Sequence, residues 1–290
     1  MTATTTATGD GSGSPIDVMW SVDQVARLLA LAEQTDRCDG WFTADDLQRL
    51  SLDTPCEDDG EKWRTAIARL GEQFTNFQIF LADSPGYPHF LLQTAHAPAV
   101  LFVRGSLDSN GAGSVAMVGS RDASEQAAEA AGEVAATLAD GGTTIVSGLA
   151  RGVDTAAHRG ALDAGGRTTA VVGTGIDVVF PPENRHLMER IVRNGAVVSQ
   201  FPPGLGPSKT SFPVRNAVIA GLSSASVVIE AEELSGTRIE MDYSLEFNRP
   251  VLLWAPVLGK RPWARSLAAA DDNVHLVCSA SEIRELAFQH

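Results

Sequence analysis

The chain has 290 residues, of which 44% are hydrophobic and 20% are charged, and its formal net charge at pH 7 is −14. This composition is typical of a soluble globular protein, with room for one large α/β domain and a small additional one. No apolar run approaches the roughly 20 residues that a membrane span requires, and the N-terminus lacks the basic and apolar regions of a signal peptide. We therefore expect a cytoplasmic protein without a membrane partner.

The charges are unevenly distributed. Residues 1–114 carry 7 basic and 16 acidic side chains, whereas residues 115–255 carry 11 and 16. Nucleic-acid-binding proteins usually present a broad basic field, so this balance argues against tight non-specific DNA binding and leaves a local, arginine-rich pocket. The three cysteines, Cys38, Cys56 and Cys278, are too scattered for a disulfide framework or a metal knuckle. We expect neither a metal nor a cofactor.

The N-terminal region predicts helices. Residues 1–15 are of low complexity and hold almost no large apolar side chains, which predicts a disordered tail. Apolar spacing over 21–32 predicts an amphipathic helix, Thr43 is a candidate cap of a second, and 62–70 forms a third. The sequence therefore predicts a small helical subdomain over residues 16–80, with no evident chemistry.

A second predicted domain covers residues 81–290, where short apolar strands alternate with helices. The predicted strands are 97–105, 115–118, 143–147, 168–172, 196–199, 226–230, 251–254 and 274–278, and the predicted helices are 124–139, 154–164, 184–194, 214–222, 237–247 and 282–287. This alternation predicts an α/β fold with a mostly parallel sheet, right-handed crossovers and helices on both faces.

Three of these strands open into loops that contain glycine. Glycine lets the backbone approach a phosphate, and the next helix directs its free N–H groups and positive dipole end to the same point. Because parallel strands end at one edge of a sheet, we expect a single anion-binding edge there. The candidate residues are Gly119, Ser120, Arg121, Ser147, Gly148, Arg151, Gly173 and Gly175.

Two later segments add to the same edge. Arg215 and Asn216 begin an apolar helix, and a buried arginine there needs an anionic partner, either a ligand phosphate or Glu230. Ser235, Gly236 and Thr237 open the next helix, where they form either a phosphate site or an ordinary cap.

Other polar groups near this edge have structural alternatives. Asp154 is either a helix cap or the partner of His158, which lies one helical turn later. A hydrolytic triad of Ser147 and His158 with an aspartate lacks the glycine spacing of a nucleophile elbow, so we assign no catalytic residue on this basis. Phe180 is either a base-stacking face or a buried aromatic.

Taken in order, these motifs resemble the DNA-processing protein A family (DprA, also called Smf), over about residues 85–285. The resemblance implies an extended Rossmann-like fold, non-catalytic single-stranded DNA binding, a homodimer, and delivery of incoming DNA to a RecA-type recombinase in natural transformation. Its DNA-pocket residues correspond to Ser120, Arg121, Ser147, Gly148, Arg215 and Asn216. The motifs are Val118-Gly-Ser-Arg121, Ser147-Gly-Leu-Ala-Arg-Gly-Val-Asp154 with Ala157-His158, Gly173-Thr-Gly175, Phe212-Pro-Val-Arg-Asn216 with Ile219-Ala-Gly-Leu-Ser223, and Glu230 with Ser235-Gly236.

The chain departs from that family in ways that open an alternative. Ala217 replaces a usual basic residue, and Gly236-Thr-Arg-Ile-Glu240 together with Arg215 resembles the glutamate and arginine of the lonely-guy phosphoribohydrolases, although their proline-glycine-glycine lead is absent. Those enzymes cleave the glycosidic bond of a nucleoside monophosphate. A third interpretation is a nucleotide-sensing defence protein without turnover. An enzyme would release base and depend on Glu240, whereas a DNA binder would tolerate its loss.

Overall fold

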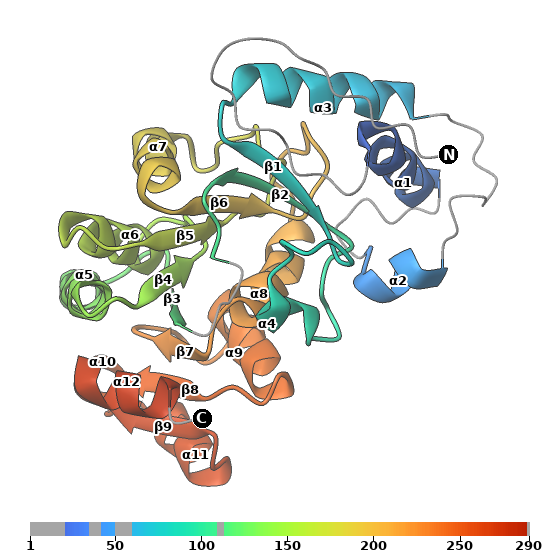
Figure 1. Cartoon of the computed structure of the whole chain (residues 1–290). Helices are drawn as coiled ribbons and strands as arrows, with labels where there is room; N and C mark the ends of the chain where they lie inside the picture. Colours follow the sequence, from blue (N-terminus) through green and yellow to red (C-terminus); the bar gives the residue numbers. More distant parts are fainter. Residues whose placement is uncertain (1–20, 35–41, 50–59, 109–112, 289–290) are drawn as a thin grey trace.

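The computed structural model describes residues 21–34, 42–49, 60–108 and 113–288. The predicted tail over residues 1–15, Cys38, Cys56 and most of the acidic stretch that follows Cys56 lie outside the described residues. The described part contains a nine-stranded sheet in the order β1-β2-β6-β5-β4-β3-β7-β8-β9 (Figure 1).

The sheet is parallel from β6 to β9 along this order, while β2 pairs antiparallel with both β1 and β6. This arrangement confirms the predicted α/β fold with a mostly parallel sheet. The strands are β1 Phe77–Leu81, β2 Val100–Gly105, β3 Ser114–Val118, β4 Thr144–Ser147, β5 Thr168–Val171, β6 Ala196–Ser199, β7 Ala225–Val228, β8 Val251–Trp254 and β9 Val274–Val277.

Helices cover both faces of the sheet. Along β3, Val115 and Met117 join one apolar cluster with α5, α6 and α12, while Ala116 and Val118 join the other, as the two-residue period of a strand requires. Figure 1 shows α5 and α6 on one side of the sheet and α8 and α9 on the other. The helices are α1 Val22–Gln34, α2 Ala44–Arg49, α3 Glu61–Gln73, α4 His89–Leu92, α5 Glu125–Asp140, α6 Val153–Asp163, α7 Arg185–Asn194 after the 3₁₀ turn Pro182–Asn184, α8 Ser211–Gly221, α9 Gly236–Glu246, α10 Ala255–Leu258, α11 Pro262–Ala270 and α12 Ala280–Ala287.

The predicted N-terminal helices are present and pack onto the sheet. Leu28 of α1 and Ile67 of α3 belong to the same apolar cluster as Phe102 of β2. Thr43 caps α2 as predicted: its hydroxyl accepts from the Asp46 N–H, and the Asp46 carboxylate accepts from the Thr43 N–H. β1 crosses the boundary predicted at residue 80, and the division into two domains stays a prediction.

The order of the strands determines where a site can form. From β3 the chain adds β4, β5 and β6 on one side, and it then returns to place β7, β8 and β9 on the other. The loops after β3 and β7 therefore diverge, which opens a crevice at the carboxyl ends of these strands. Among the described residues, no helix has the length and apolarity needed to cross a bilayer.

Candidate phosphate-binding site

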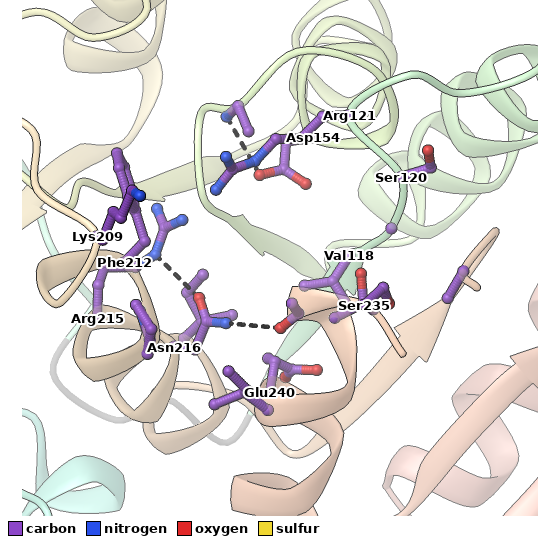
Figure 2. Close-up of a pocket in the computed structure, with 18 of the residues that line it drawn as sticks. Val118, Ser120, Arg121, Asp154, Lys209, Phe212, Arg215, Asn216, Ser235 and Glu240 are labelled. Carbon is purple, nitrogen blue, oxygen red and sulfur yellow. Dashed lines mark hydrogen bonds between the residues drawn. The ribbon is translucent and has the colours of Figure 1, made fainter. Parts of the chain in front are cut away.

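A cavity of about 720 Å³ lies at this divergence (Figure 2). Its wall is formed by the loop after β3, the start of α6, the segment leading into α8, and the first turns of α8 and α9. The sequence-predicted site residues on this wall are Gly119, Ser120, Arg121, Arg215, Asn216, Ser235, Gly236, Thr237 and Glu240.

Arg215 is the most buried cation of the wall, at 4% exposure. Its Nη1 donates to the main-chain carbonyl of Gly148, at 2.6 Å, and to that of Val171, so the ends of β4 and β5 hold the guanidinium. Gly148 makes room for this contact, because a Cβ there would lie 2.6 Å from the guanidinium nitrogens. Burial lowers the pKa of Arg215 to about 10, against the opposing effect of Asp154. Arg215 is therefore still charged at neutral pH.

The carboxyl of Asp154, on α6, lies near the charged groups of Arg215 and Arg121. It accepts a hydrogen bond from the Ala150 N–H at 3.2 Å. Burial raises the pKa of Asp154, and the nearby charges of Arg215 and Arg121 oppose that rise. Burial therefore favours the neutral form of Asp154, and the two cations favour its charged form.

Arg121 and Lys209 are exposed and complete the cationic part of the wall. The guanidinium carbons of Arg121 and Arg215 lie 5.1 and 5.9 Å from the ring centre of Phe212. Phe180, on the same wall and 37% exposed, lies 5.7 Å from Phe212 between ring centres. The wall thus offers charge for a phosphate and an aromatic face for a base.

On the opposite side, α9 contributes Ser235 and Glu240 (Figure 2). Ser235 stands at the N-cap of α9, and its buried hydroxyl has no hydrogen-bond partner among the described residues. The Asn216 amide donates to the Gly236 carbonyl at 3.3 Å, which joins α8 to α9.

The other predicted site residues lie beside the cavity and not on its wall. The hydroxyl of Ser147 donates to the Met117 carbonyl at 2.6 Å, and Gly148 contributes the carbonyl that Arg215 binds. Arg151 is exposed and lies 3.4 Å from Glu183. Two glycines serve close packing: Gly173 lies against the Phe212 ring, and Gly175 lies against the chain at residues 202–204.

The sequence left two pairings open, Arg215 with Glu230 and Asp154 with His158, and the structure shows other partners for Glu230 and His158. The Glu230 carboxylate accepts from the Ser124 N–H and hydroxyl, at 2.9 and 2.7 Å, so Arg215 does not depend on it. His158 lies 2.7 Å from the Thr168 hydroxyl instead of pairing with Asp154. Burial lowers the pKa of His158 to about 3, so its ring is neutral at physiological pH.

The sequence predictions omitted Lys209 and Phe212, although both line the cavity. Lys209 lies in the irregular segment between β6 and α8, where no periodicity predicts which side chains turn inward. A usable signal was the position of both residues a few places before Arg215, with Lys209 just ahead of α8 and Phe212 in its first turn.

The fold and this cavity define a Rossmann-like α/β protein with a candidate anion site at the switch point of its sheet. The sequence model of the family described as DNA recombination-mediator protein A matches residues 78–287. The chain belongs to this family.

Curated relatives agree with this assignment. DNA processing protein DprA of Streptococcus pneumoniae is 42% identical over 184 residues, which cover 63% of this chain and 65% of the relative. Protein Smf of Escherichia coli is 39% identical over 177 residues, which cover 61% of this chain and 47% of the relative. The matched part thus spans about half to two thirds of these relatives.

Solved structures also match. The X-ray structure of DprA from Streptococcus pneumoniae superposes with a TM-score of 0.66 at 32% identity, covering 91% of this chain and 92% of that chain. DNA processing protein A from Helicobacter pylori, described with a unique single-stranded DNA binding mode, gives 0.62 at 22% identity, covering 71% and 93%. The first match supports the family as well as the fold, and the second shows the fold alone.

Proposed function

We infer that this chain binds single-stranded DNA in the cavity without chemical turnover. By family, it protects incoming DNA in the cytoplasm, acts as a homodimer and passes the DNA to a RecA-type recombinase in natural transformation. Family membership supports a DNA-processing role, and the Helicobacter pylori relative is described as binding single-stranded DNA.

One observation supports this function above the others. Arg121, from the loop after β3, and Lys209 and Arg215, from the start of α8 and the segment before it, line one cavity beside the Phe180 and Phe212 rings. Guanidinium and ammonium groups bind phosphate oxygens, and aromatic rings stack on bases of any sequence. A single strand offers both groups together, because its bases are unpaired.

Fluorescence anisotropy with a labelled oligodeoxynucleotide tests the proposal. We expect saturable binding by the wild type, and a loss in Arg121→Ala and in Lys209→Ala because each removes a charge-assisted contact worth about 1.5–3 kcal/mol, or roughly ten- to a hundredfold in affinity. Arg190→Ala is the control, because it removes an equal charge from an ion pair with Asp163 that is not on the cavity wall. Absence of saturable binding at low salt would refute the proposal.

A second candidate function is hydrolysis of a nucleoside monophosphate. Its support is that Glu240 and Arg215 both line the cavity and that burial raises the pKa of Glu240 to about 7, in the range of a general acid at neutral pH. In that reaction water adds to C1′ of the sugar and the base leaves with a proton. Release of free base by the wild type, abolished in Glu240→Gln, would establish this activity in place of the first.

A further inference from the structure

Two buried carboxyl groups line the cavity, and they differ in how their oxygens are satisfied. Asp154, 6% exposed, accepts from the Ala150 N–H and faces Arg215 and Arg121. Glu240 is 1% exposed and lies on α9, across the cavity from Arg121 (Figure 2). Two cations, Arg215 and Arg121, act on the charge of Asp154, whereas Arg215 alone of the two acts on that of Glu240.

Among the described residues, one of the two oxygens of the Glu240 carboxyl has a hydrogen-bond partner. Its Oε1 accepts a hydrogen bond from the Ser226 hydroxyl, which itself shares a hydrogen bond with Ser244. Its Oε2 is buried and has no hydrogen-bond partner among the described residues. A buried polar atom without a partner is costly, so a ligand group in the cavity that reached Oε2 would relieve this cost.

The protonation of Glu240 follows from its surroundings. Burial raises its pKa to about 7, and the Asp154 charge adds to this rise. The nearby Ser226 and Ser244 hydroxyls and the Arg215 charge oppose it. With Ser226 donating to Oε1, a proton carried on Oε2 has no hydrogen-bond partner among the described residues. Neutral Glu240 is therefore a hydrogen-bond donor, whereas ionised Glu240 repels a phosphate.

We propose that the Glu240 carboxyl, through Oε2, hydrogen-bonds an uncharged acceptor atom in the sugar or base of a nucleotide whose phosphate lies at Arg121, Lys209 and Arg215. This proposal rests on the proposed function and adds an orientation to it. The phosphate lies beside the three cations because they attract it, whereas an ionised carboxyl on α9 would repel it. Sugar oxygens, base carbonyls and ring nitrogens all accept such a bond.

The test is an anisotropy titration between pH 5.5 and 8.5 with an oligodeoxynucleotide that has no terminal phosphate, so that the ligand charge stays constant. Wild-type affinity should be highest below pH 7 and fall above it, because binding favours the protonated form. Glu240→Gln, which keeps a neutral donor, should show no such fall. Glu240→Ala should bind roughly two- to tenfold more weakly than the wild type at pH 5.5, and no more weakly at pH 8.5.

Two further variants and one competitor separate the outcomes. Asp242→Asn changes an exposed carboxylate of α9 that pairs with Arg238, and it should keep the wild-type profile. Loss of the pH dependence in Asp154→Asn but not in Glu240→Gln would overturn the proposal. Inorganic pyrophosphate should compete equally with the wild type and Glu240→Ala, because it contacts only the cationic side. Absence of oligonucleotide binding by the wild type at every pH would overturn both proposals.

Discussion

At the scale of single residues, Arg215 and Arg121 differ in their burial and in their hydrogen bonds to the rest of the protein. Arg215 satisfies the carbonyls of Gly148 and Val171 in the interior, while Arg121 is exposed. Removing one partner of a buried charged group costs on the order of 3 kcal/mol. We therefore expect Arg215→Ala to lose both DNA binding and thermal stability, and Arg121→Ala to lose binding alone. Thermal denaturation followed by circular dichroism checks this, and equal melting midpoints in the two variants would contradict it.

The sequence could predict which residues carry charge at the site, but not how the buried ones are held. The sequence predicts that Arg215 meets either a phosphate or Glu230. Its carbonyl partners lie at the ends of β4 and β5, far from it in the chain. Glu240 was a candidate only through a resemblance. Its burial and the unpaired Oε2 depend on packing against Ser226 of β7, which a local pattern does not encode.

At the scale of elements, α5 and α6 approach closely at two glycines. A Cβ on Gly160 would lie 2.1 Å from the Gly132 carbonyl oxygen, whereas a Cβ on Gly132 would find its nearest neighbour at 3.8 Å. Gly160→Ala should therefore destabilise the fold by about 1–3 kcal/mol through overpacking. Gly132→Ala is the matched control and should be neutral or stabilising by up to about 1 kcal/mol, because alanine favours a helix. Urea denaturation measures both, and a stable Gly160→Ala would show that the helices separate freely.

The buried parallel strands and the helices between them were predictable, whereas β1, α4, α10 and the nine-residue α11 were not predicted. Each predicted strand from 115 to 278 and each helix from 124 to 247 is present to within a few residues, because buried parallel strands and amphipathic helices leave clear patterns. β1 was absent from the prediction, since only its two end residues are buried. The four-residue helices α4 and α10 are too short for a helical period to appear.

At the scale of the whole molecule, the chain has a net charge of −14, and three of its cations line the cavity. Each phosphate neutralised on a single strand contributes about 0.7 to the logarithmic salt slope. With Arg121, Lys209 and Arg215 as the cations of the wall, we expect a slope of about 2. Titrations at several salt concentrations give this value, and a slope above about 4 would reveal a basic surface elsewhere on the chain.

The pairing of β7 with β3 divides the sheet into two halves, which affects how cooperatively the sheet unfolds. Arg121 and Asp154 follow β3 and β4, in the half of the sheet that runs from β3 to β6, whereas Ser235 and Glu240 follow β7. The seam between these halves is the β3–β7 ladder, which pairs residues 115–118 with 225–228. A ligand that touches both walls acts as a non-covalent cross-link over this seam, so its binding free energy opposes separation of the halves. Amide hydrogen exchange along the seam would slow on binding, while fraying at the outer strands would not.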